Sequence, residues 1–110
     1  MAKGNYLGDF EQLVLLAVMR LGDRAYGMSV RREIEANSER NVSLGAIYAT
    51  LDRLEEKGLV SSALGKATPE RRDRAKRFFK VRAPGVRALQ DTLAALDRMR
   101  WGIEELERPV

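Results

Sequence analysis

Residues 42–82 of the chain, VSLGAIYATLDRLEEKGLVSSALGKATPERRDRAKRFFKVR, decide the predicted fold. The first third of this stretch has leucine and isoleucine residues at steps of three and four, which is the spacing of one helix face. Ser43 is suited to cap the start of a helix, and Gly58 is suited to end one. The stretch therefore begins with a predicted amphipathic helix at 43–57.

Two strand-like runs, 59–64 and 75–81, follow this helix, and the loop between them contains Gly65 and Pro69. This pattern predicts a hairpin with a long tip. Residues 66–82 hold eight basic and two acidic side chains, whereas the whole chain has a net charge of only +4. Positive charge is thus confined to the hairpin, which favours a polyanionic partner. The alternative is a solvated arginine-rich turn.

Two helices are expected before this stretch. The first, at 9–21, has Asp9 and Gln12 as a capping pair and Gly22 as a stop. It is apolar on most sides and must be covered on most sides, so we expect part of it to meet a second subunit. The alternative is a core helix within one chain. The second helix, at 26–37, is apolar on one face only.

A last helix is expected at 84–107, with apolar residues at steps of three and four along most of its length. It packs back on its own domain or pairs with a second copy, and the apolar first helix favours the homodimer. The predicted dimer interface consists of Phe10, Leu13, Ala17, Leu89, Leu93, Leu96, Met99, Ile103 and Leu106.

The expected fold class is mainly α with a small β hairpin, arranged as a winged helix-turn-helix followed by a C-terminal dimerisation helix. At 110 residues the chain fits one such unit with a small core. We expect a DNA-binding domain at 7–82, a dimerisation helix at 83–108, and flexible termini at 1–6 and 109–110.

The helix at 43–57 has the features of a recognition helix, because small side chains on its outer face allow close approach to a groove. Hydroxyls of Ser43, Tyr48 and Thr50 are available for phosphates or base edges, although the Tyr48 ring has the alternative of filling the core. Small faces also occur where helices pack together. Asp52, Glu55 and Glu56 would repel DNA if they faced it. The predicted DNA contacts are Ser43, Gly45, Ala46, Tyr48, Ala49 and Arg53 from the helix, and Lys66, Arg71, Arg72, Arg74, Lys76 and Arg77 from the hairpin.

The composition argues against an enzyme. The chain contains no cysteine and no histidine, so it lacks a thiolate, a disulfide framework and the commonest general base and metal ligand. Acids such as Glu33 and Glu55 have no partner groups to complete a site. We expect no catalytic residues, no cofactor and no metal. The longest apolar run, 13–19, is too short to span a bilayer and lacks the layout of a secretory signal, so we expect a cytoplasmic protein without a membrane partner.

The sequence resembles the PadR-like transcriptional regulators in three motifs. These are YGMSVRREIE at 26–35, VSLGAIYATLDRLEEKGLVSS at 42–62 and RAKRFFKV at 74–81. The resemblance covers about residues 7–106, and the length is similar to the short subfamily that has one C-terminal helix. It implies a dimeric winged-helix repressor that binds a near-palindromic DNA operator, with the last helix crossing to the partner subunit.

The chain departs from the family pattern at two places. Family members usually enter the last helix through a Thr-Pro-x-Gly sequence, whereas residues 82–85 read RAPG, so the start of this helix is not fixed by the sequence. Phe78 and Phe79 replace the paired tyrosines that are usual in the wing strand.

Trp101 raises an alternative function. In some small PadR-like regulators, a tryptophan of the last helix lines a ligand channel between subunits and stacks on flat, often cationic, drugs. The resemblance therefore implies, as the alternative, a multidrug-type sensor whose small aromatic effector binds at the dimer interface near Trp101 and releases DNA. The simpler interpretation is that the indole covers neighbouring apolar surface.

Overall fold

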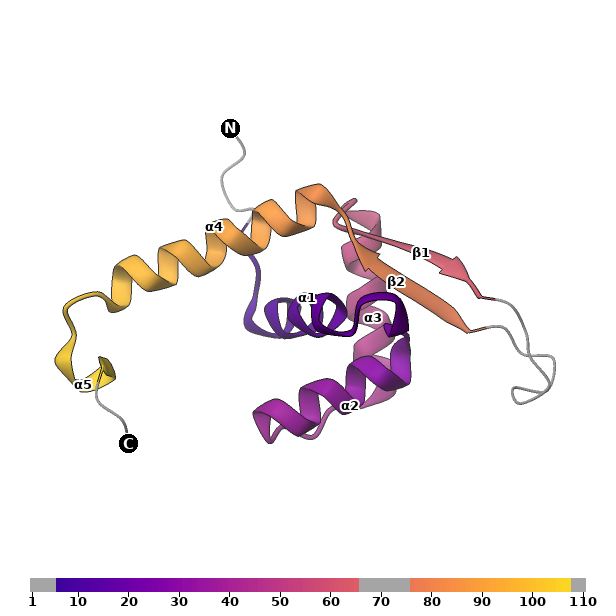
Figure 1. Ribbon diagram of the computed structural model, residues 1–110, viewed down its shortest axis with the longest axis horizontal. Coiled ribbons are helices and arrows are strands. Elements are labelled where there is room, and N and C mark those ends of the chain that lie inside the picture. The colour runs from indigo at the N-terminus through magenta and orange to yellow at the C-terminus, as the bar shows by residue number, and fades with distance from the viewer. Residues whose placement is uncertain (1–5, 66–75, 108–110) are drawn as a thin grey trace.

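The structure, a computed structural model, describes residues 6–65 and 76–107 and is mainly helical with one two-strand antiparallel hairpin (Figure 1). This fold class agrees with the sequence prediction. The elements are α1 (Asp9–Leu21), the 3-10 turn η1 (Gly22–Arg24), α2 (Gly27–Ser38), α3 (Leu44–Glu56), β1 (Val60–Leu64), β2 (Arg77–Val81), α4 (Ala83–Arg100) and α5 (Glu104–Glu107).

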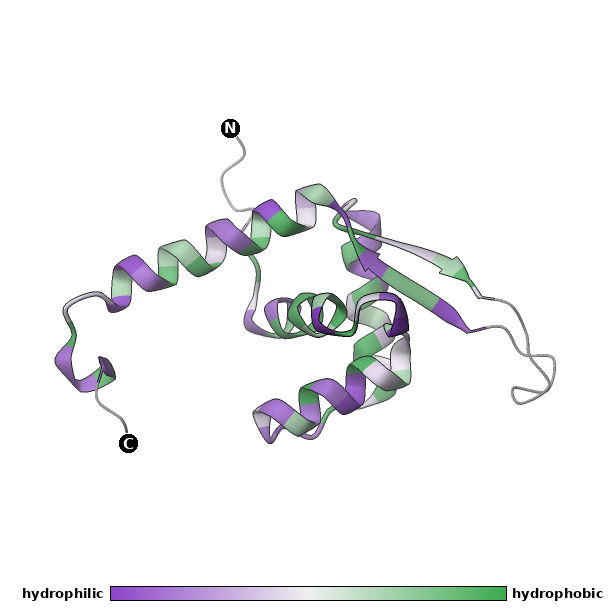
Figure 2. Cartoon of the chain, in the orientation of Figure 1, coloured by the Kyte–Doolittle hydropathy of each residue, from purple (hydrophilic) through white to green (hydrophobic). Residues whose placement is uncertain are grey.

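The core lies where α1, α2 and α3 pack together beneath the hairpin. Figure 2 shows that α1 is apolar along most of its surface, whereas α2 and α4 alternate between apolar and polar residues. Val14, Leu15, Ala17 and Val18 of α1 are buried within the single chain, but Met19 remains 46% exposed. The chain itself therefore covers much of the first helix, as the alternative interpretation held.

The ends of α3 and α1 were predicted correctly at two positions. The backbone N–H of Ala46 donates to Ser43 Oγ at 3.0 Å, which confirms Ser43 as the cap of α3. Gly22 follows α1 with a φ of +61°, a left-handed value that favours glycine. Both signals are local, because each depends on one residue at a helix terminus.

The predicted capping pair of α1, Asp9 and Gln12, is wrong by one residue. The cap is Gly8, whose N–H donates to the Glu11 carboxylate at 3.0 Å. The Gln12 side-chain amide instead donates to the carbonyl of Leu7 at 3.0 Å. Glu11 lies three residues after Gly8, and Gln12 lies three residues after Asp9, so both pairs have the spacing of a capping box. Only the backbone conformation of the turn selects Gly8 and Glu11.

The hairpin pairs β1 with β2 in register, from Val60 opposite Val81 to Leu64 opposite Arg77. Phe79 points into the core and is 3% exposed. Both strands fall within the predicted runs 59–64 and 75–81, although residue 75 lies outside the described part of the chain.

Strand β2 is also attached to the segment just before α2. The Phe79 N–H donates to the Ala25 carbonyl at 2.9 Å, and Tyr26 forms a β-bridge with Phe78. These contacts place the base of the wing beside the start of α2, as Figure 1 shows.

Helix α4 begins with a close approach between backbones. Arg82 is its N-terminal cap residue without a side-chain cap, and Pro84 lies in the first turn. A Cβ added to Gly85 would lie 2.3 Å from the Leu59 carbonyl oxygen, so only glycine fits there without a shift. The RAPG sequence therefore starts the helix by backbone packing where a hydroxyl cap is missing.

The predicted helix at 84–107 is wrong in its extent. Helix α4 ends at Arg100, and the chain then turns through Gly102, whose φ is +82°, before the short α5. The apolar spacing continues across this turn, which is why the sequence pattern did not reveal it. Ile103 and Leu106 consequently do not continue the face of α4.

Candidate nucleic-acid interface

The N-terminal half of α3 presents small side chains at the surface. Gly45, Ala46 and Ala49 are exposed, whereas Ile47 and Leu51 on the other face are fully buried. Among the described residues, no helix packs over these small side chains. A face without bulk allows the helix axis to lie close to the floor of a major groove.

The hydroxyl groups of Ser43 and Thr50 differ in their exposure. Ser43 is exposed at the start of the helix, where its Oγ accepts the capping hydrogen bond. Thr50 is only 3% exposed, so the prediction that its hydroxyl faces DNA is wrong. Thr50 lies three residues after Ile47 and four before Leu54, which places it on the buried face.

Tyr48 is half-buried and connects α3 to the start of α2. A Cβ added to Gly27 would lie 2.3 Å from the Tyr48 hydroxyl, so the phenol is lodged against the first turn of α2. The ring packs against the hydrophobic core. The Tyr48 ring therefore packs in the core, which is one of the two alternatives from the sequence. Its hydroxyl lies at the N-terminus of α2.

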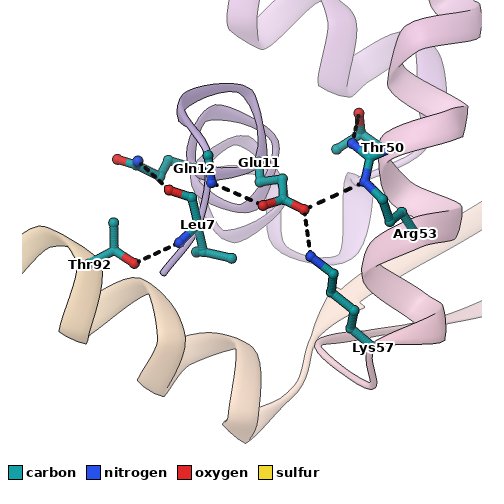
Figure 3. Close-up of polar contacts among 8 residues, drawn as sticks. Leu7, Glu11, Gln12, Thr50, Arg53, Lys57 and Thr92 are labelled. Atoms are coloured by element: carbon teal, nitrogen blue, oxygen red, sulfur yellow. Dashed lines mark hydrogen bonds and ion pairs between the residues drawn. The ribbon is translucent and has the colours of Figure 1, made fainter. Parts of the chain in front are cut away.

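Arg53 lies in a cluster centred on the Glu11 carboxylate (Figure 3). Arg53 Nε lies 3.6 Å from Glu11 Oε2, and Lys57 Nζ lies 3.0 Å from the same oxygen. The Glu11 side chain is 12% exposed, whereas both cations are about half exposed. Glu11 of α1 thus binds the second half of α3 through two basic residues.

The charge of Glu11 is stabilised by these neighbours. Burial alone would raise the pKa of this carboxyl group, but the hydrogen bond from Gly8 and the nearby charges of Lys57 and Arg53 outweigh burial and lower the pKa. Glu11 was not among the residues predicted from the sequence. Its signal was the acid at the third position of the α1 helix, which is typical of a capping residue.

The same turn connects α4 to α1. The Leu7 N–H donates to Thr92 Oγ1 at 3.1 Å, and Thr92 is buried on α4 (Figure 3). Leu7 precedes the Gly8 cap, which binds Glu11. A continuous series of contacts therefore runs from α4 through this turn to α3.

Arg77, predicted to contact DNA, is directed at the carboxylates of α3. Its guanidinium lies 2.9 Å from Asp52 Oδ1 and 2.5 Å from Glu55 Oε1, and its Nε donates to Ser62 Oγ at 3.1 Å. Burial tends to lower the pKa of Arg77, but the two carboxylates raise it. Arg77 therefore pairs with two of the three acids that would repel DNA, which offsets part of their negative charge, and it fixes β2 against α3.

The other predicted hairpin contacts divide into two groups. Lys66, Arg71, Arg72 and Arg74 lie outside the described residues. Lys76 is described, and its Nζ lies 3.9 Å from the centroid of the Tyr26 ring. Lys76 is thus at the base of the wing, next to α2.

The predicted dimer residues differ in how far their own chain covers them. Ala17 and Leu89 are buried within the chain. Phe10 and Leu13 are partly exposed. The residues that remain exposed are Leu93, Leu96 and Met99 on α4, and Ile103 and Leu106 beyond its end. Figure 1 shows that the second half of α4 extends away from the core.

Trp101 is 82% exposed at the C-terminal end of α4. It lines a shallow open hollow with Asp97, Arg100, Leu106 and Glu107. The indole is therefore not covered by apolar surface of its own chain, contrary to the simpler interpretation of this residue.

Metal and membrane features are not found in the part of the chain that the structure describes. No group of three acidic, cysteine or histidine side chains there is arranged to hold a metal ion. No helix among these residues has the length and apolar character needed to cross a bilayer.

The Glu11 cluster predicts a pH-dependent contribution to stability. Glu11→Gln keeps an oxygen acceptor for Gly8 but removes the charge that faces Lys57 and Arg53. We expect the free energy of unfolding at neutral pH to fall by about 1 kcal/mol, since the cations are half exposed. Because the folded pKa is the lower one, the loss is full above the unfolded carboxyl pKa of about 4.3 and vanishes as pH falls through the folded pKa.

Urea unfolding of both proteins across a pH series measures this difference. Glu56→Gln is the matched control, because it removes an exposed carboxylate from α3 that forms no ion pair among the described residues. A stability loss for Glu11→Gln that stays constant with pH would contradict the ionic explanation.

Comparison with known proteins places this geometry in a family. The model of the PadR-like family of transcriptional regulators matches residues 15–91. No curated protein matches the sequence. One similar solved structure is a PadR family regulator from Clostridium difficile R20291, which is 17% identical and has a TM-score of 0.73; the match covers 90% of this chain and 98% of that one. Another is a PadR family regulator from Eggerthella lenta DSM 2243, which is 21% identical and has a TM-score of 0.67; the match covers 90% of this chain and 84% of that one.

A further similar structure is F93 from STIV, which is described as a winged-helix DNA-binding protein. It is 16% identical, the match covers 88% of this chain and 97% of that one, and the TM-score is 0.67. At these identities the structures support the winged-helix fold, while the family model spans α3, the hairpin and the start of α4. The family is one of regulators and not of enzymes. The chain belongs to the PadR-like family of transcriptional regulators.

Proposed function

We propose that this protein is a homodimeric, sequence-specific transcriptional repressor that binds a near-palindromic operator, with α3 in the major groove and the basic wing on the DNA backbone. The observation that carries the proposal is the open face of Gly45, Ala46 and Ala49 at the start of α3. It lies beside a wing that Arg77 fixes to the same helix. The proposed DNA-binding domain is the 7–82 expected from the sequence, and the proposed dimerisation helix is α4, which ends at Arg100 and not at 108 as expected.

The charges of α3 support this orientation. Asp52 and Glu55 lie in its later turns, where carboxylates next to phosphates would oppose binding. Arg77 pairs with both, so the helix presents less negative charge than its sequence indicates. The basic stretch 66–82 supplies cations for phosphates, and DNA contact implies action in the cytoplasm.

Dimerisation is supported by apolar surface that one chain leaves open. Leu93, Leu96 and Met99 are 36%, 46% and 76% exposed on the part of α4 that extends from the core. A second copy related by a two-fold axis would cover these residues and present two α3 helices to successive major grooves. A near-palindromic operator has the matching symmetry.

Trp101 favours a second candidate function, the small-molecule-responsive sensor. The exposed indole offers a flat stacking surface, and Glu107 in the same hollow suits a cationic aromatic ligand, while Asp97 there is paired with Arg100. Titration with flat aromatic cations tests this function. Quenching of Trp101 fluorescence together with release of bound DNA would support it, and unchanged fluorescence would contradict it.

The main proposal predicts selective binding to the DNA upstream of the protein's own gene. Fluorescence anisotropy should show about a thousandfold preference for this DNA over a scrambled duplex. Ala49→Glu should abolish the preference without changing the melting temperature, because Ala49 is exposed and the carboxylate would face the groove. Ala36→Glu, an exposed site on α2, is the matched control. Equal affinity of the wild-type protein for both duplexes would overturn the proposal, as would retained selectivity in Ala49→Glu. Reporter transcription with and without the protein tests repression.

The ion pairs of Arg77 predict that loss of operator binding in an Arg77 variant is reversed when the charges of Asp52 and Glu55 are also removed. Arg77→Gln should weaken operator binding about tenfold, or about 1.4 kcal/mol, because Asp52 and Glu55 become unpaired near DNA. Adding Asp52→Asn and Glu55→Gln should restore affinity. Arg100→Gln, which breaks an ion pair on α4, is the control. If the triple variant stays weak and its salt dependence is flatter, Arg77 contacts phosphate directly.

The exposed face of α4 predicts the effect of charged substitutions. Leu93→Asp with Leu96→Asp should give a folded monomer that loses operator affinity, because neither residue is buried in its own chain. Sedimentation velocity measures the mass, and anisotropy measures the affinity. Ala94→Asp, an exposed neighbour on α4, is the control. A dimer that persists in the double variant would contradict this interface.

A further inference from the structure

Several arginine and lysine side chains near the proposed DNA-binding surface are paired with acids in the described part of the chain. Arg53 and Lys57 pair with Glu11, and Arg77 pairs with Asp52 and Glu55. Arg32 of α2 and Lys76 at the base of the wing differ from these, because neither forms an ion pair with a carboxylate among the described residues. No carboxylate of the described residues therefore competes with an external anion for these two charges.

Both of these cations lie next to the phenol of Tyr26. Lys76 Nζ lies 3.9 Å from the centroid of the Tyr26 ring, a cation–π distance. The pKa of Tyr26 is lowered, chiefly by a hydrogen bond from Lys76, with a further contribution from Arg32. Lys76, from the base of the wing, thus lies over the ring of Tyr26, and Arg32 of α2 lies near the same phenol.

The position of Tyr26 is fixed by the wing. Its ring meets Phe78 edge to face, with centroids 5.7 Å apart and an interplanar angle of 72°. The backbones of the two residues also form a β-bridge. Tyr26 is the cap residue of α2, so the phenol and its two cations are held where β2 meets the start of this helix.

The cluster lies beside the open face of α3. The Tyr48 hydroxyl of α3 is lodged against Gly27, the residue after Tyr26. Figure 1 shows the start of α2 beside β2, on the side from which the hairpin extends. When α3 enters a major groove, this position is occupied by the sugar–phosphate backbone at the edge of the groove, because the first helix of a helix-turn-helix crosses the backbone.

We propose that Tyr26, Arg32 and Lys76 form a clamp for one DNA backbone phosphate, which anchors the start of α2 independently of base sequence. The inference rests on the proposed DNA-binding function. Arg32 and Lys76 are held by a neutral phenol and a ring face, so a phosphate gains two cations without the breaking of an ion pair. The Tyr26 hydroxyl supplies a third donor to the phosphate oxygens.

Salt-dependent anisotropy with the upstream DNA and a scrambled duplex tests the clamp. Arg32→Gln and Lys76→Gln should each weaken binding to both duplexes by the same factor, about three- to tenfold. Each should also reduce the slope of log K against log salt by about 0.9, which is the loss of one phosphate contact. Arg32→Lys and Lys76→Arg should keep the slope, because they keep the charge.

Tyr26→Phe separates the hydroxyl from the ring. It keeps the contacts with Phe78 and Lys76 that use the ring, so the fold is retained. It should weaken binding to both duplexes about threefold and leave the salt slope unchanged. Arg98→Gln is the matched charge control, since Arg98 is exposed in the last turn of α4, far from the wing (Figure 1). It should leave affinity and slope at wild-type values.

If Arg32→Gln and Lys76→Gln both leave the salt slope unchanged, the clamp is overturned. Selectivity of the wild-type protein for the upstream DNA would still support the proposed function. If these variants lose affinity for the upstream DNA only and not for the scrambled duplex, the clamp is also overturned, because such a loss indicates a base contact. If the wild-type protein binds both duplexes equally, the specific regulator is wrong, yet the reduced slopes would still support the clamp. A wild-type protein that binds neither duplex overturns both proposals.

Discussion

The carboxylate of Glu11 joins elements that are far apart in sequence. It accepts the capping hydrogen bond at the start of α1 and pairs with Arg53 and Lys57 of α3. The adjacent backbone of Leu7 binds Thr92 on α4. One short turn therefore links the proposed recognition helix to the proposed dimerisation helix, and in it a partly buried charge is stabilised by a helix terminus and two cations.

Internal pairing of charges determines which cations of the proposed DNA-binding surface lack an acidic partner among the described residues. The net charge of the chain is modest, and many of its cations are used within the fold. Arg77 pairs with Asp52 and Glu55 and offsets part of their charge, whereas Arg32 and Lys76 lie beside the neutral Tyr26. Residues of the same chemical type thus have two roles: paired cations position the wing and α3, whereas cations without an acidic partner in the described part of the chain are those proposed to bind phosphates.

Local patterns predicted most of the fold. The capping of α3 by Ser43 and the pairing of the two strand-like runs follow from signals within a few residues of each other. The errors have equally local causes. Glu11 and Gln12 offered the same spacing from possible caps, and the apolar spacing of α4 continues across the turn at Gly102. A periodic pattern does not report where the backbone leaves the helix.

The sequence by itself determined the order of helices and strands, the open small face of α3 and the concentration of positive charge in 66–82, because propensity, capping and periodicity act over short distances. Only the tertiary structure decided which charges are paired. The contacts of Arg77 with Asp52, of Glu11 with Lys57 and of Lys76 with Tyr26 join residues from different elements. Their distances depend on how α1, α3 and β2 pack around the shared core, which spacing along the chain does not encode.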